Sequence, residues 1–177
     1  GIVAELPARL ATAGPDPSQV KLVFGAIRGG DAANVIPSTL ELRASVRTPI
    51  ADVWQQLPQL VRRSLDELLA DSGAEYELEY THGVPAVIND EHVTDTVRRA
   101  ATGEFGDVAV YEAEQSWGGD DFAWLTREVP GTYVRLGVHD PERDEQLDLH
   151  AGHFDVHEGV IPLGVQLLVA TAREHYR

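Results

Sequence analysis

The chain has 177 residues, 43% of them hydrophobic and 24% charged, which is the mixture of a globular protein with one domain or two small ones. A net charge of −15 argues against nucleic acid as a partner, and no apolar run or N-terminal pattern supports a membrane span or a secretory signal. We expect a cytoplasmic protein without a membrane partner, and the absence of cysteine leaves His, Asp and Glu as the candidate metal ligands.

The first half of the chain predicts an antiparallel sheet with helices on one face. Helical spacing over residues 2–10 precedes strands at 21–28 and 39–46, and the second strand alternates apolar and polar residues as a half-solvated strand does. An apolar stripe predicts a helix over 50–70, which Pro58 should kink or divide in two. A third strand is expected at 75–81, with Tyr76, Leu78 and Tyr80 on one face. This order indicates an α+β fold.

After a crossing at residues 83–85 the second half alternates helices with short strands. Asn89 and Asp90 should cap a helix that runs to about residue 102. Strands are expected at 108–111 and 132–138, a short helix ends near Arg127, a charged loop covers 139–149, and a closing helix spans 156–175. Strands that alternate with helices indicate part of an α/β layer.

Residues 29–47, GGDAANVIPSTLELRASVR, combine a glycine-rich turn with a strand. Asn34 lies in the turn and Arg47 ends the strand. An arginine fork fits a carboxylate and an asparagine amide both donates and accepts, so the pair could grip a substrate carboxylate. The alternative is an ordinary hairpin with an Asn-containing turn and an exposed arginine.

Two further clusters could carry chemistry. Gly118 and Gly119 precede a short helix, where a substrate could approach the backbone N–H groups; the alternative is a turn with Asp120 or Asp121 as helix cap. Residues 150–158 hold His150, two further histidines and two acids, a composition typical of metal sites, although each could also be a surface residue.

Taken in order, these pieces resemble the C-terminal half of the two-metal amidohydrolases and exopeptidases that include aminoacylases, hippurate hydrolases and carboxypeptidase G. The matching pieces are GGDAANVIPSTLELRASVRT, GVPAVIND, SWGGDDFAWL followed by PGTYVRLG, and LHAGHFDVHEGVIPLGVQLL. The resemblance covers the whole chain, and the ordered set of four is specific.

The resemblance implies two domains. Residues 1–87 would be an α+β lid or dimerisation domain, a four-stranded sheet with two helices that here lacks its first strand. Residues 88–177 would be the C-terminal segment of the α/β metallohydrolase domain. The lid implies a homodimer, in which lid residues can reach the active site of the partner subunit.

The resemblance also implies roles for single residues. Asn34 and Arg47 would hold the carboxylate of an N-acyl amino acid or peptide, Gly118 and Gly119 would line the substrate pocket, and His150 would be a metal ligand. The family's other metal ligands and its general-base glutamate come from pieces that do not occur in this sequence. Three residues depart from the family pattern. After the last ligand, Gly152 stands where proline is usual and His157 where an acid is usual, and before the short helix Asp120 stands where glutamate is common.

These implications lead to an expectation about activity. The full-length protein would bind two divalent ions, zinc, manganese or cobalt, whereas this chain would contain no catalytic residue, bind no metal alone and be inactive alone. The alternative is a non-enzymatic module for self-association, suggested by the apolar helix face around Trp54, Leu57, Leu60 and Val61.

Overall fold

The computed structural model describes residues 1–140, 142 and 148–176. The chain divides into two compact units. The first unit contains Gly1–Val87 and Trp117–Trp124, and the second contains Ile88–Ser116 and Leu125–Arg177. The segment Trp117–Trp124 therefore returns to the first unit, although about thirty residues of the second unit precede it.

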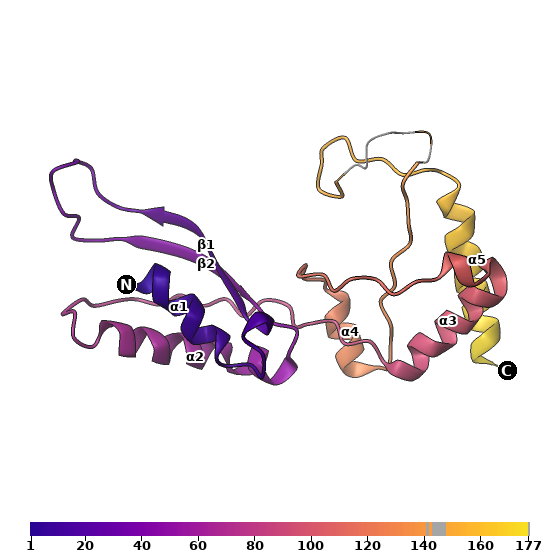
Figure 1. Ribbon diagram of the computed structural model, residues 1–177, viewed down its shortest axis with the longest axis horizontal. Coiled ribbons are helices and arrows are strands. Elements are labelled where there is room, and N and C mark those ends of the chain that lie inside the picture. The colour runs from indigo at the N-terminus through magenta and orange to yellow at the C-terminus, as the bar shows by residue number, and fades with distance from the viewer. Residues whose placement is uncertain (141, 143–147, 177) are drawn as a thin grey trace. The chain divides into compact units, whose positions relative to one another are not determined.

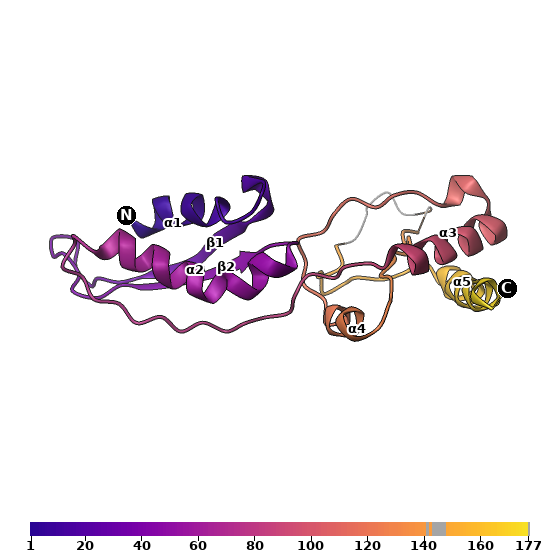
Figure 2. The same cartoon turned by 90° about the horizontal axis from the view of Figure 1, so that it is seen from below.

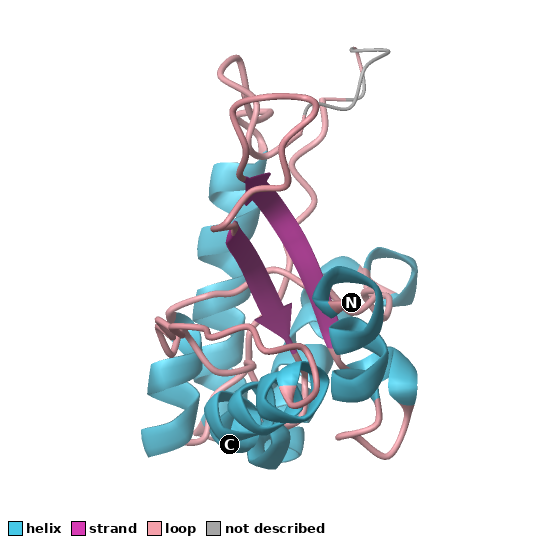
Figure 3. Ribbon diagram, turned by 90° about the vertical axis from the view of Figure 1, so that its left-hand side faces the viewer, coloured by secondary structure: helices cyan, strands magenta, loops and turns pink. Residues whose placement is uncertain are grey.

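The first unit is a hairpin covered on one face by two helices. Its elements are α1 (Ile2–Ala11), a 3-10 turn η1 (Pro17–Gln19), β1 (Lys21–Arg28), β2 (Glu41–Arg47) and α2 (Ala51–Leu69). β1 and β2 run antiparallel (Figure 3), and α1 and α2 lie beside each other against them (Figure 1; Figure 2). The predicted antiparallel pair with helices on one face is confirmed.

The hairpin register is shifted once, at a bulge. Lys21 pairs with Arg47 and Phe24 with Ala44, whereas Ala26 pairs with Arg43, so Gly25 is the extra residue. A glycine accommodates such a bulge because it has no side chain to pack. The core face carries Leu22, Phe24 and Val46, and the opposite face carries Lys21, Val23, Ser45 and Arg47.

The core of the first unit lies between the hairpin and the helices. Its buried side chains come from α1, the residue before β1, and α2: Leu6, Leu10, Val20, Val53, Leu57, Val61 and Leu65. Trp54 and Leu60 pack against them. The apolar stripe of α2 is therefore core, and the support that it lent to a self-association module is lost.

α2 continues through Pro58 as one helix, so the predicted division into two is wrong. A proline lacks the N–H that would bond the carbonyl four residues earlier, which here belongs to Trp54. His82 supplies the missing donor, since its Nε2 donates to the Trp54 carbonyl at 3.0 Å, and its ring stacks on the indole at 3.8 Å.

Residues 75–81 form no strand, contrary to the prediction. Tyr76, Leu78 and Tyr80 are nevertheless half-buried and pack on the core, so the predicted alternation of faces is confirmed. The Tyr76 hydroxyl donates to Asp66 Oδ1 at 2.5 Å, which anchors the segment to α2. The described sheet consists of β1 and β2 alone, so the backbone of residues 75–81 has no neighbouring strand with which to form ladder hydrogen bonds.

The second unit is organised around two packed helices, α3 (Glu91–Phe105) and α5 (Val160–His175). Arg99 Nε bonds Glu174 Oε1 across them at 3.0 Å. Asp90 caps α3 as predicted, accepting from the Val93 N–H at 2.9 Å. A 3-10 turn η2 (Asp107–Ala109) follows α3, and α4 (Phe122–Glu128) crosses from the first unit into the second.

The predicted strands at 108–111 and 132–138 are wrong, because no described residues there form a ladder. Asn89 instead bonds the backbone of Tyr133 through both amide atoms, at 3.2 and 2.7 Å. The closing helix starts at Val160 rather than near 156, after a turn at His157.

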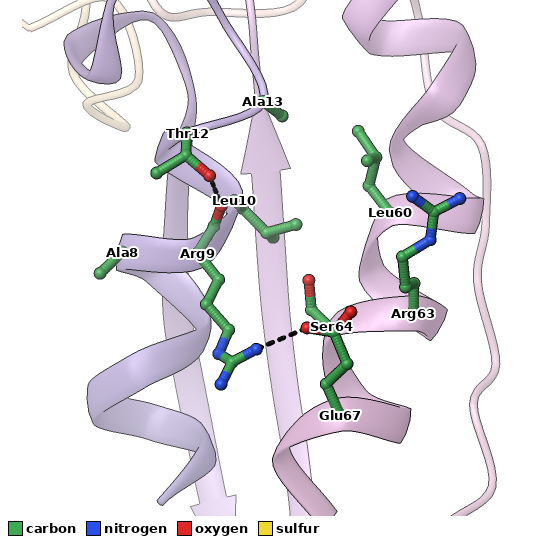
Figure 4. Close-up of a pocket in the computed structure, with 9 residues that line it drawn as sticks. All are labelled: Ala8, Arg9, Leu10, Thr12, Ala13, Leu60, Arg63, Ser64 and Glu67. Carbon is green, nitrogen blue, oxygen red and sulfur yellow. Dashed lines mark hydrogen bonds and ion pairs between the residues drawn. The ribbon is translucent and has the colours of Figure 1, made fainter.

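One shallow surface pocket of about 500 Å³ lies between α1 and α2 (Figure 4). Arg9 bridges the two helices there, bonding Glu67 Oε2 at 2.6 Å. None of the predicted site residues lines this pocket. Within the described part of the chain, no helix is long and apolar enough to cross a membrane.

Candidate substrate-binding site

Asn34 and Arg47 lie at opposite ends of the hairpin. Asn34 is in the loop between β1 and β2, which the Arg28–Glu41 pair closes, whereas Arg47 pairs with Lys21 at the other end. A strand of this length spans roughly 20 Å, so one chain does not bring the two side chains together. The structure therefore separates the two halves of the predicted carboxylate grip.

The loop that carries Asn34 is exposed and is shaped by its two glycines. A side chain at Gly29 would come within 2.3 Å of Leu40 Cδ2 and 2.9 Å of the Thr39 carbonyl oxygen, and Gly30 has a φ of +81°. Only glycine fits both conditions without strain. The loop leaves Ile36 92% exposed, an unusual position for a large apolar side chain.

Below the loop, charged side chains on the outer face pair with one another. Arg43 Nε donates to Glu41 Oε1 at 2.6 Å, and this hydrogen bond holds the pKa of Glu41 below its ordinary value. Arg28 lies 3.8 Å from the other oxygen of Glu41. These arginines are engaged at the loop end of the hairpin.

At the other end of the hairpin, Arg47 meets the returning segment. Its Nη1 donates to the carbonyl oxygen of Trp117, the residue before Gly118. The ammonium of Lys21, the cross-strand partner of Arg47, lies 3.9 Å from the centre of the Trp117 indole ring. Three of the four predicted substrate-binding residues, Arg47, Gly118 and Gly119, thus lie in or next to one contact.

The contact of Lys21 with Trp117 was not predicted from the sequence. Gly25 carried the signal, because a glycine inside a strand pattern indicates a bulge, and the shifted register places Lys21 opposite Arg47. No sequence pattern indicated that Trp117 would return to this rung of the hairpin.

The two glycines are positioned by packing and by a cap. A side chain at Gly119 would come within 2.8 Å of Val84 Cγ2, so the backbone approaches the first unit closely at this point. Asp120 Oδ1 accepts from the Phe122 N–H at 2.8 Å and caps the start of α4. The cap that the alternative interpretation required is therefore present, and the substrate contacts of Gly118 and Gly119 stay a prediction.

The segment is held at its far end by aromatic packing. Trp124 meets Trp54 edge to face, with ring centres 6.0 Å apart, and Ala123 beside it is fully buried. Trp54 is the residue that His82 stacks on and hydrogen-bonds. Both ends of Trp117–Trp124 are therefore fixed to the first unit.

His150 lies in the second unit, in an exposed turn. Its N–H donates to Asp148 Oδ1 at 2.8 Å. His157 has a structural role, since its Nδ1 accepts from the Gly159 N–H at 3.2 Å and its own N–H donates to the Val138 carbonyl. Among the described residues, no three His, Asp or Glu side chains converge where they could hold a metal ion. This donor set does not form a metal centre by itself.

Comparison with known proteins places these features in a family. The model of peptidase family M20/M25/M40 matches residues 5–174. The chain is 39% identical to a putative glutamate–cysteine ligase of Rhodococcus jostii over 86% of its length and 19% of the relative's. It is 32% identical to a probable hydrolase of Synechocystis, covering 88% of this chain and 40% of the relative.

Two proteins of Bacillus subtilis add chemistry to the comparison. An N-acetyl-L-cysteine deacetylase is 29% identical over 86% of this chain and 35% of its own length. The crystal structure of the YxeP protein, a dinuclear metal-binding peptidase, superposes with a TM-score of 0.69 at 25% identity, over 96% of this chain and 45% of the other. The chain spans less than half the length of each of these proteins.

Proposed function

Since the chain belongs to peptidase family M20/M25/M40, we propose that it is the part of a metal-dependent amidohydrolase that binds the substrate carboxylate. The substrates would be N-acyl amino acids or related C-terminal amides. The relatives named as a deacetylase and as a metal-binding peptidase support hydrolysis of an amide bond.

The observation that carries the proposal is the contact between Arg47 and Trp117. A guanidinium has five N–H donors in a fixed plane, and the Trp117 carbonyl takes one of them. The remaining donors can bind a carboxylate in two-pronged geometry, next to the Gly118–Gly119 backbone. The site would thus recognise the free carboxylate that an N-acyl amino acid retains.

Asn34 would contribute to the substrate site of the other protomer in a dimer. One chain keeps it a strand length away from Arg47, so a contribution to the same substrate requires a second protomer. We therefore propose a homodimer formed through the first unit, the predicted lid domain. The exposed apolar residues of the loop, Val35, Ile36 and Leu40, support an interface there.

The metal centre would come mostly from other parts of the full-length protein. His150 would hold one of two divalent ions, and such ions would supply Lewis-acid activation of the amide carbonyl and of a water. Among the described residues, no three candidate ligands converge into a metal site around His150 or elsewhere. We therefore expect the 177-residue chain to be inactive by itself, and its contribution to be binding and orientation of the substrate.

The test compares substrates with and without the carboxylate. The full-length protein, supplied with zinc, manganese or cobalt, should hydrolyse an N-acetyl amino acid and lose most of its kcat/KM on the corresponding N-acetyl amino acid amide. Arg47→Gln should remove that preference, whereas Arg43→Gln, on the same face of the same strand, should keep it. A full-length protein that is metal-free and inactive, or an equal rate on both substrates, would contradict the proposal.

A further inference from the structure

Two cations converge on one residue at the open end of the hairpin. Lys21 and Arg47 are direct cross-strand partners, and both contact Trp117, one at the indole ring and the other at the carbonyl oxygen. Lys21 is the only lysine of the chain. Like charges directly opposite each other in a sheet are destabilising, and the electron-rich ring face and carbonyl oxygen of Trp117 offset the repulsion between these two cations.

The other two cations of the hairpin strands are neutralised by an acid. Arg28 and Arg43 both pair with Glu41, and on α1 Arg9 likewise pairs with Glu67. No ion pair joins Lys21 or Arg47 to an acid in the described part of the chain, although the sequence has 29 acidic residues. In the described part of the chain, these two cations therefore share a contact with Trp117 and not with an acid.

Contacts with the rest of the first unit hold the backbone around Gly118 and Gly119 in place. Trp117 is held by Lys21 and Arg47, Gly119 lies against Val84, and Trp124 packs on Trp54. The two glycines lack side chains and have more conformational freedom than any other residue. An anchor directly before them restricts where their N–H groups can point.

We propose that Lys21 is a positioning residue for the carboxylate site. Its ammonium holds the Trp117 ring by a cation–π contact, so that the Trp117 carbonyl orients Arg47 and the following backbone presents Gly118 and Gly119. Lys21 itself need not touch the substrate. The effect of Lys21 on substrate binding rests on the proposed function. Its contact with Trp117, and the effect of that contact on the backbone, can be tested without any activity.

The first test uses hydrogen exchange of the 177-residue chain, measured for the amides of residues 117–121. Lys21→Met keeps an apolar stem and removes the charge, and it should speed exchange about two- to fivefold, the range of an exposed cation–π contact. Lys21→Arg should restore the rate, because a guanidinium also binds an aromatic face. Arg28→Met, which removes one positive charge from the same strand, should leave these amides unchanged.

A double substitution assigns the effect to the ring. Trp117→Leu keeps the carbonyl and removes the indole, so it should speed exchange as Lys21→Met does, and the two together should add nothing further. Additive effects, or no change in Lys21→Met, would overturn the proposal.

The second test uses the full-length protein with an N-acetyl amino acid. Lys21→Met should raise KM with kcat nearly unchanged, Lys21→Arg should return KM to the original value, and Arg28→Met should have no effect. A fall in kcat alone, or a changed KM that Lys21→Arg fails to rescue, would overturn the positioning role. If the unsubstituted protein does not hydrolyse these substrates, the proposed function fails, while the exchange experiment still decides whether Lys21 anchors the segment.

Discussion

The two units bury very different side chains. The first unit encloses leucines and valines from α1, α2 and the hairpin, including Leu57, which is 1% exposed. The buried residues described in the second unit are Thr96, Ala100 and Ala101, and α5 has no buried residue at all. Large apolar residues of α5 such as Ile161 and Leu168 are 63% and 72% exposed.

The difference shows what each architecture can achieve with its own residues. A hairpin and two helices form two layers, and the space between the layers is a core. A pair of helices buries only the stripe where they touch, which α3 fills with small residues, and the remaining apolar faces need another layer. The second unit has two packed helices and no paired strands among its described residues.

The largest expected effect tests this contrast in core packing. Leu57→Ala should lower the free energy of unfolding of the first unit by about 2–5 kcal/mol, since it removes a fully buried side chain and leaves a cavity. Leu168→Ala, the matched change on the exposed face of α5, should cost about 0.5 kcal/mol or less. Urea unfolding, followed by hydrogen exchange in each unit, measures the two changes in unfolding free energy. Equal losses of stability in the two variants would contradict the contrast in core packing.

A smaller effect should be confined to the second unit. Asp90→Ala removes the side chain that accepts from the Val93 N–H, and should destabilise α3 by about 1 kcal/mol. Asp90→Asn retains a capping oxygen and is the control. Faster exchange in the first turn of α3, with α1 and α2 unchanged, is expected; a change that spreads to α1 and α2 would show that the units unfold together.

A comparable effect is expected at the proline of α2. His82→Phe keeps a ring to stack on Trp54 but removes the Nε2 donor, and should cost about 1 kcal/mol. In the Pro58→Ala background the helix supplies its own N–H to the Trp54 carbonyl, so the same substitution should cost much less. Unfolding free energies of the four proteins give the coupling, and an unchanged cost in both backgrounds would contradict this role of His82.

The smallest effect is a pH dependence in the first unit. The hydrogen bond to Asp66 raises the pKa of Tyr76 above its ordinary value of 10.0. A raised pKa means that the protonated hydroxyl is favoured in the folded state, so this stabilisation is complete below pH 10.0 and is lost as the pH rises through the raised pKa. The stability difference between the original chain and Tyr76→Phe should therefore shrink in alkaline solution, and a constant difference would argue against the bond.

The sequence alone determined the elements whose hydrogen bonds are local. The amphipathic spacing of α1 and α2, the cap at Asp90 and the glycine-rich turn before Asn34 all specify structure within a few residues, and each was predictable. The positions of Asn34 at the loop and of Arg47 at the end of the strand followed from the same reasoning.

Only the tertiary structure decided what depends on a distant partner. The strands expected at 75–81, 108–111 and 132–138 have suitable patterns, but a strand needs a neighbour to take its hydrogen bonds, and a pattern does not supply one. The donor that compensates Pro58 comes from His82, 24 residues away, and the partner of Lys21 and Arg47 is Trp117, which returns from beyond the second unit's first helix. Helical hydrogen bonds join residues that are four apart in the sequence, so a local pattern predicts them. The contacts of His82 and Trp117 join distant residues and form only when the chain packs.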